Sequence, residues 1–179
     1  ISKKGTPTMG GFLILAALTL STLLWADLTN GCIWAALFVT IGFGAVGFAD
    51  DWLKVSRRES RGLPGRIKLL LLTVIAAVAA IWIMSMLPDS LAAYMAVPFF
   101  KQVLVNLGWG FVAFAVFVMV GASNAVNLTD GLDGLAIVPV MIAIAVFALI
   151  AYLVGNSMFA NYLQLHYVPG SGELAVFCG

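Results

Sequence analysis

Several apolar runs in this sequence are about as long as the hydrocarbon core of a membrane is thick. A spanning helix needs about 20 mostly apolar residues. Such runs cover residues 9–26, 32–49, 67–87, 107–122 and 135–154, and a sixth begins at 174. Charged residues make up only 9% of the chain, against about 25% in a soluble domain. The sequence therefore predicts an all-α fold, a polytopic transmembrane helix bundle in one membrane-embedded domain, with five complete spans and the start of a sixth.

The basic residues lie almost entirely on one side of the predicted membrane. Lys3 and Lys4 precede the first run, and six more follow the second run, whereas Lys101 alone falls on the other side. Cytoplasmic loops carry the excess of Lys and Arg. We therefore expect the predicted loops 50–66 and 124–134 to be cytoplasmic. A net charge of +1 gives no indication of a nucleic-acid partner, and we expect none.

Two adjacent carboxylates, Asp50 and Asp51, follow the second apolar run. Carboxylates close to hydrocarbon are costly and indicate function. Such a pair can hold Mg²⁺, which prefers carboxylate and water oxygens, or supply a general base. Lys54 would share a helical face with Asp50 if the helix continued, and it could then hold a phosphate. The competing interpretation is a solvated helix end that carries an ion pair.

Polar residues recur at every third position after the fourth run. They are Asn124, Asn127, Asp130 and Asp133. Gly131 and Gly134 are expected to break the helix there and to let backbone approach a ligand. Amides and carboxylates suit ribose hydroxyls, a base edge or a metal ion. An EF-hand is excluded because its residue pattern is missing, whereas two Asx-Gly turns without a ligand remain an alternative.

A third polar segment, residues 3–11 with the sequence KKGTPTMGG, precedes the first run. A helix N-terminus binds anions through its free N–H groups and its dipole. Lys3 and Thr8 are therefore candidates for binding a diphosphate, although anchoring on the positive side of the membrane explains the lysines equally well. Lys68, just inside the third run, is a further candidate. All three polar segments are predicted to meet at the cytoplasmic surface.

These segments together resemble a known family. Residues 3–11, 48–54 (FADDWLK) and 124–136 (NAVNLTDGLDGLA) are similar in order and spacing to bacterial phospho-N-acetylmuramoyl-pentapeptide-transferases. That family belongs to the polyprenyl-phosphate N-acetylhexosamine-1-phosphate transferases. The resemblance extends over essentially the whole chain, and the opening motif is its most specific part.

The resemblance implies a Mg²⁺-dependent enzyme of the bacterial inner membrane that makes lipid I and UMP during peptidoglycan synthesis. The implied partners are undecaprenyl phosphate, UDP-MurNAc-pentapeptide, the lipid bilayer and, as one option, a second copy of the chain. By resemblance, Asp50 is the base that deprotonates the lipid phosphate or, on another account, a nucleophile. Asp51 supports Asp50 and helps to hold the metal.

The remaining matched positions are assigned to substrate binding by the same resemblance. Lys3 and Thr8 would line the nucleotide and phosphate pocket, and Lys54 and Lys68 would hold phosphates. Asn124, Asn127, Asp130 and Asp133 would shape the site, with Asp133 near the uracil.

Part of the family pattern has no counterpart in this sequence. The family carries a further acidic metal ligand and a histidine-rich loop beyond the point that matches residue 179. We therefore expect the chain to be an internal fragment that is inactive alone. The alternatives are a UDP-GlcNAc:polyprenyl-phosphate GlcNAc-1-phosphate transferase, a transporter and a structural membrane subunit. A transporter would hold its carboxylates near the midplane of the membrane rather than at one surface.

Overall fold

The fold is a bundle of long antiparallel helices. The computed structural model describes residues 10–57, 62–97, 103–129 and 135–179. The long helices are α1 (Gly10–Trp25), α2 (Gly31–Arg57), α3 (Gly65–Met86), α4 (Gly110–Thr129) and α5 (Ile137–Gly155). Two short strands, β1 (Tyr94–Ala96) and β2 (Leu104–Asn106), precede α4, while α6 (Ser157–Tyr162), the 3-10 turn η1 (Ser171–Glu173) and α7 (Leu174–Cys178) follow α5.

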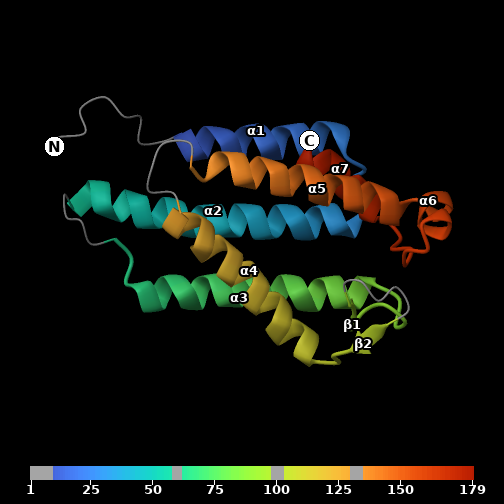
Figure 1. Cartoon of the computed structure of the whole chain (residues 1–179). Helices are drawn as coiled ribbons and strands as arrows, with labels where there is room; N and C mark the ends of the chain where they lie inside the picture. Colours follow the sequence, from blue (N-terminus) through green and yellow to red (C-terminus); the bar gives the residue numbers. More distant parts are fainter. Residues whose placement is uncertain (1–9, 58–61, 98–102, 130–134) are drawn as a thin grey trace.

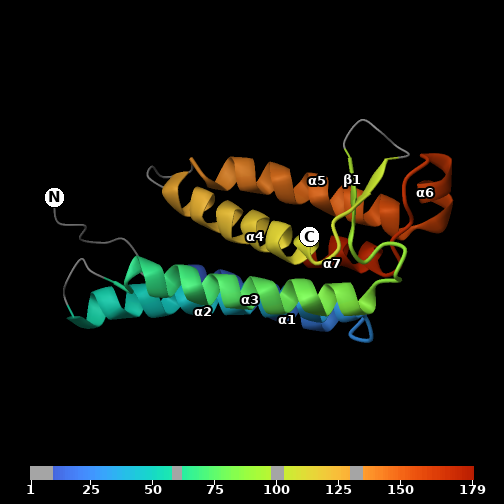
Figure 2. The same ribbon diagram turned by 90° about the horizontal axis from the view of Figure 1, so that it is seen from below.

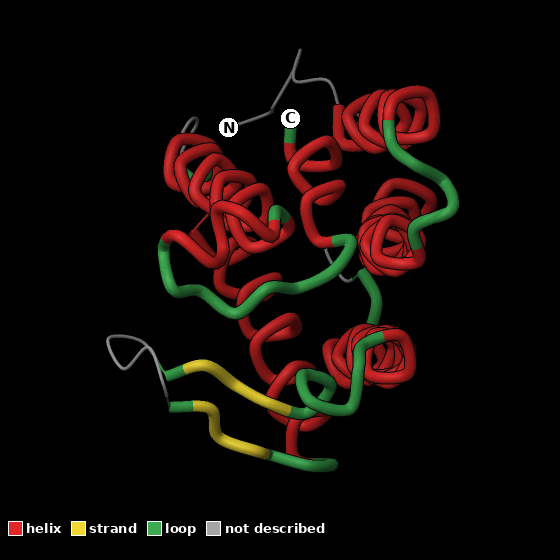
Figure 3. The backbone as a smooth tube through the Cα atoms, turned by 90° about the vertical axis from the view of Figure 1, so that its right-hand side faces the viewer, coloured by secondary structure: helices red, strands yellow, loops and turns green. Residues whose placement is uncertain are grey.

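The long helices form two layers. Helices α1, α2 and α3 lie side by side in one layer, and α4 and α5 lie across from them (Figures 1 and 2). Seen end-on, α7 lies between α5 and the pair α1 and α2 (Figure 3), and it contacts all three helices. The end of α2, the start of α3 and the start of α5 all lie at the same end of the bundle (Figure 1).

The membrane character predicted from the sequence is confirmed. Four helical segments are long and apolar enough to cross a membrane: Gly31–Ser56, Gly65–Met86, Gly110–Thr129 and Ile137–Gly155. Helix α1 is apolar but has only 16 residues, so its crossing stays a prediction. Many large apolar side chains of these helices are exposed, as expected of surfaces that face lipid.

The predicted end of the second span was wrong. Helix α2 ends at Arg57 rather than at residue 49, so Asp50, Asp51 and Lys54 are helical instead of lying in a loop. A helix ends at a breaker or an unmade cap rather than where apolar residues stop, and no Gly or Pro occurs between Phe48 and Arg57. Pairs of opposite charge three and four residues apart also support this last part of α2.

The predicted loop 124–134 was also too long. Helix α4 continues to Thr129, so Asn124 and Asn127 are helical. The Asn124 side chain donates a hydrogen bond to the Val120 carbonyl at 2.8 Å, which satisfies the amide without leaving the helix. Residues 130–134 lie outside the described residues.

The two strands were not predicted. They pair antiparallel, with Met95 opposite Val105, and this hairpin is the only sheet among the described residues. It lies at the other end of the bundle from the end of α2 and the start of α3 (Figure 1). Helix α3 ends before the hairpin because Leu87, which precedes Pro88, is forced into an extended conformation.

Polar contacts also join the α1–α2 link to the segment before α7. The Asp27 N–H donates to Glu173 Oε2 at 3.1 Å, and Asn30 Nδ2 donates to the Gly170 carbonyl at 2.7 Å. Hydrogen bonds from the hydroxyl and the N–H of Thr29 hold the pKa of the Asp27 carboxyl below its usual value. These contacts close the bundle at the hairpin end.

The buried core lies between α2, α3 and α4. Val46, Leu72, Ala76 and Val120 form it, and Phe43, Ile75, Val116 and Met119 pack around it. Small alanines on α3 let its neighbours approach closely, as is typical of helix contacts in membranes.

Substitution of Leu72 should destabilise the protein far more than substitution of a leucine on the outer face of the same helix. Leu72 is 2% exposed, whereas Leu70 is 61% exposed. We expect Leu72→Ala to lower the free energy of unfolding by about 2–5 kcal/mol through the cavity that it leaves. Heat unfolding of the full-length protein in detergent, with Leu70→Ala as the control, measures the difference. Equal losses would contradict the assigned core.

Candidate functional site

A cluster of charged side chains lies where α2 ends and α3 begins. Asp50, Asp51 and Lys54 belong to the last turns of α2, and Lys68 belongs to the first turn of α3. Because these helices are antiparallel neighbours, the two sequence segments meet at one end of the bundle (Figure 1). We call this the charged end and define it by these four residues.

Asp50 is the most enclosed member of the cluster. Its residue surface is 8% exposed. Oδ2 accepts a hydrogen bond from Lys54 Nζ at 2.7 Å and lies 3.9 Å from Lys68 Nζ. Oδ1 accepts from the Leu63 N–H at 2.7 Å. Both carboxylate oxygens therefore have partners, which offsets the cost of removing a charge from water.

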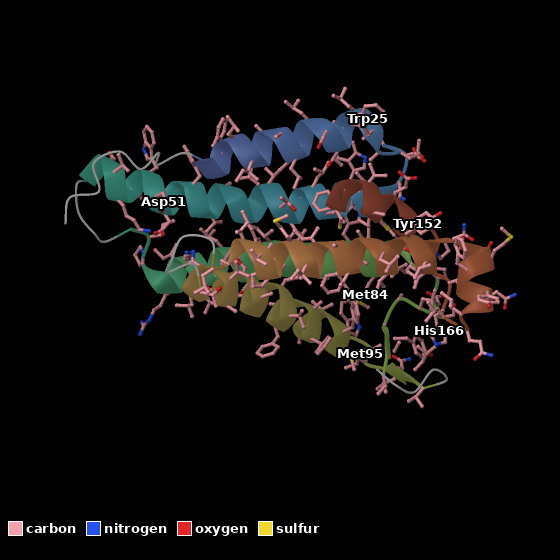
Figure 4. The ribbon with its side chains drawn as sticks, turned by 45° about the horizontal axis from the view of Figure 1, so that its top comes forward. Trp25, Asp51, Met84, Met95, Tyr152 and His166 are labelled. Atoms are coloured by element: carbon pink, nitrogen blue, oxygen red, sulfur yellow. The ribbon has the colours of Figure 1, made fainter. Side chains whose placement is uncertain are left out.

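Asp51 lies in a different environment although it is the next residue. Its side chain is 70% exposed, and it accepts a hydrogen bond from Lys54 Nζ at 3.1 Å. Successive helical residues point about 100° apart because a turn holds 3.6 residues. Asp50 therefore faces Leu63 in the α2–α3 link, whereas Asp51, labelled in Figure 4, is largely exposed at the charged end. Lys54 bridges the two carboxylates.

A groove beside Asp51 was missed by the sequence analysis. It lies between α1 and α2, has a volume of about 340 Å³ and is lined mainly by apolar side chains. Gly11 on α1 and Gly44 and Gly47 on α2 leave room for it. Phe48 stacks on Trp52 with ring centroids 6.0 Å apart and forms part of its wall. Gly47 and Gly44, four and seven positions before Asp51, were the signal that could have predicted it.

The structure brings some of the predicted site residues together and leaves others apart. Asp50, Asp51, Lys54 and Lys68 form one cluster. Asn124 and Asn127 lie near the end of α4, and the hydrogen bond described for Asn124 stays within its own helix. Lys3, Thr8, Asp130 and Asp133 lie outside the described residues, so their roles stay predictions.

Two of the described residues could serve as ligands of a magnesium ion. Asp50 and Asp51 supply carboxylate oxygens, which are the ligands that Mg²⁺ prefers. No group of three or more His, Cys, Asp and Glu side chains that could hold a metal occurs among the described residues. The donor chemistry fits Mg²⁺, and the remaining ligands would have to be water, substrate phosphate or residues outside this part of the chain.

Comparison with known proteins identifies the family. The profile of glycosyl transferase family 4 matches residues 33–172, which include the whole charged end. The chain belongs to glycosyl transferase family 4. Residues 3–15 also match signature 1 of phospho-N-acetylmuramoyl-pentapeptide-transferase.

Curated relatives support the resemblance seen in the sequence. A phospho-N-acetylmuramoyl-pentapeptide-transferase from Granulibacter bethesdensis is 63% identical over 99% of this chain and 49% of its own length. One of the same name from Rhodopseudomonas palustris is 57% identical over 100% of this chain and 50% of its own length. The predicted resemblance is thereby confirmed, and the chain spans about half the length of these relatives.

Removal of the Lys54 ammonium should destabilise the protein because the enclosed Asp50 would keep only Lys68 and the Leu63 N–H as partners. We expect Lys54→Ala to lower the free energy of unfolding by about 1 kcal/mol, at the low end for a hydrogen bond to a charged group because Lys54 is partly exposed. Arg66→Ala is the control, since it removes the same charge from an exposed residue nearby.

The measurement is heat unfolding of both variants in detergent. A larger loss in Arg66→Ala than in Lys54→Ala would show that general repulsion among charges, rather than the Asp50 contact, controls stability at this end.

Proposed function

We propose that the full-length protein transfers phospho-N-acetylmuramoyl-pentapeptide from UDP-MurNAc-pentapeptide to undecaprenyl phosphate, giving lipid I and UMP. The observation that carries the proposal is the charged end, where Lys54 and Lys68 surround one enclosed carboxylate at the edge of a membrane bundle. The names of the relatives and the matched signature support this reaction over the other transfers of the family.

The position of the charged end suits a reaction between a lipid and a soluble nucleotide. Asp50, Asp51 and Lys54 occupy the last turns of a helix that is long and apolar enough to cross a membrane. The lipid phosphate can reach such a place from the bilayer, and the nucleotide can reach it from water. We place this end at the cytoplasmic face of a bacterial inner membrane, because basic residues collect there.

The lysines can serve both the carboxylate and the phosphates. In the structure, Lys54 and Lys68 neutralise Asp50. Incoming phosphates would compete for the same ammonium groups and would leave Asp50 Oδ2 free to accept a proton. Oδ1 would stay fixed by the Leu63 N–H. The chain therefore provides a carboxylate whose reactive oxygen becomes available when the substrates bind.

The proposed step begins with a proton transfer to Asp50. Oδ2 takes the proton from the lipid phosphate, and the resulting phosphate oxygen attacks the phosphorus that is bonded to the sugar. The bond from that phosphorus to the bridging oxygen breaks, and UMP leaves with the electron pair. The ammonium groups of Lys54 and Lys68 stabilise the charge that develops on the phosphates. Asp51, with Asp50, would hold Mg²⁺, which when bound neutralises further phosphate charge.

Release of UMP tests the proposal. The full-length protein in detergent should release UMP from UDP-MurNAc-pentapeptide only when undecaprenyl phosphate and Mg²⁺ are both present. Asp50→Asn should lower the rate about 10²- to 10⁴-fold, the usual contribution of a general base. Asp89→Asn is the matched control, because Asp89 follows α3 at the hairpin end.

Two results would contradict the proposal. Release from UDP-GlcNAc alone would assign the protein to the sister GlcNAc-1-phosphate transferases, which the broader family match also accommodates. Absence of release from either nucleotide by folded protein would leave the charged end as a binding or transport site.

A further inference from the structure

The backbone of Gly62 lies directly against the carboxylate of Asp50. A Cβ atom built on Gly62 would collide with Asp50 Oδ1, and it would lie 2.9 Å from Asp50 Cγ and 2.8 Å from Lys54 Cε. Separations under 3.0 Å are too short for a Cβ atom, so side chains at this place would have to move. The next residue, Leu63, donates its N–H to the same Oδ1 atom at 2.7 Å.

The requirement for glycine at position 62 is one of space rather than of backbone conformation. The positive-φ glycines of the described chain are Gly108 and Gly170, so Gly62 has a backbone that other residues can adopt. Gly65, three residues later, has nothing within 4 Å of an added Cβ. Gly62 in the link and Gly65 at the start of α3 therefore differ in whether an added Cβ atom would meet Asp50.

We propose that Gly62 and the Leu63 N–H form a positioning device for the Asp50 carboxylate. The Leu63 N–H holds Oδ1, and the missing side chain at Gly62 leaves that oxygen the space it needs. Oδ2 is thereby directed to Lys54 and Lys68, where phosphates are expected. The inference rests on the proposed function for the role of Asp50, and it adds a residue pair that acts through Asp50 without touching substrate.

The geometry also indicates what alanine at position 62 would do. The atoms closer than 3.0 Å to the added Cβ atom belong to the ends of two side chains, Asp50 and Lys54, and these side chains would have to rotate away from it. Rotation breaks the hydrogen bond from Leu63 and moves Oδ2 relative to both lysines. The fold can therefore survive the substitution while the reactive oxygen is misplaced.

The test compares Gly62→Ala with Gly65→Ala in the full-length protein in detergent. Misplacement of a reacting group by about 1 Å can cost about 10²-fold in rate. We expect Gly62→Ala to lower kcat for UMP release by about that factor with little change in KM for the nucleotide. Gly65→Ala should retain the wild-type kcat. Equal rates for the two variants would overturn the proposal.

A double-mutant cycle that combines Gly62→Ala with Asp50→Ala separates an effect on the position of the carboxylate from a general loss of structure. Removal of the Asp50 side chain removes the closest collision of the added Cβ atom at position 62, and it frees the flexible Lys54 side chain from Asp50 so that it can move away. Gly62→Ala should therefore lower the unfolding temperature of the wild type, but not that of the Asp50→Ala variant. An equal decrease in both backgrounds would show that alanine disturbs the link itself and would overturn the proposal.

The same experiments distinguish this inference from the proposed function. A wild-type rate of UMP release by Asp50→Asn would rule out a catalytic role for Asp50. The unfolding temperatures of the single and double variants would still measure the contact between Asp50 and Gly62. A large decrease in UMP release by Asp50→Asn, together with an unchanged rate for Gly62→Ala, would support the proposed function and reject the positioning role of Gly62.

Discussion

The fold at the charged end depends on one enclosed carboxylate that must be neutralised. Asp50 is a charged group at the end of an otherwise apolar helix, and an unpaired charge there would be very costly. Its two oxygens bind partners from three places in the chain: its own helix through Lys54, the start of α3 through Lys68, and the link between them through Leu63. The same contacts that make the charge tolerable fix the geometry of the α2–α3 corner. Breaking a partly buried ion pair of this kind costs more free energy than the pair itself contributes. The sequence therefore favours this arrangement of the α2–α3 link over others.

The sequence was sufficient to predict the helix bundle. Apolar run length predicted the long helices, and the spacing of Asp50 and Lys54 indicated a shared helical face on the condition that the helix continued, which it does. The boundaries were less well predicted, because a helix continues through polar residues such as Asp51 and Asn124 when nothing breaks it. Run length marks the thickness of the apolar layer rather than the end of the helix.

The close approach of Gly62 to Asp50 could not be predicted from the sequence. In the sequence Gly62 lies in the predicted loop 50–66 together with Pro64 and Gly65, and no local pattern separates it from Gly65. The difference depends on where the link passes over α2, which is set by the packing of α3 on α2. The β1–β2 hairpin was missed for the same reason, since it depends on pairing between two segments. Lys3, Thr8, Asp130 and Asp133 lie outside the described residues, and their assignment still rests on the resemblance alone.

The position of η1 and α7 between α5 and the first layer of helices has a consequence for the order in which the bundle assembles. Helix α5 has no buried residue of its own, and its contacts are chiefly with η1, α7 and α6. It meets the first layer mainly through α7, which contacts α1 and α2. During synthesis α5 leaves the ribosome before residues 171–178, so at that moment it has no surface on which to dock. Helices α2 to α4 can associate as they are inserted, because their shared core is complete once Val120 is present. Insertion of α5 should therefore precede its docking, and the bundle closes only after residues 171–178 have been synthesised.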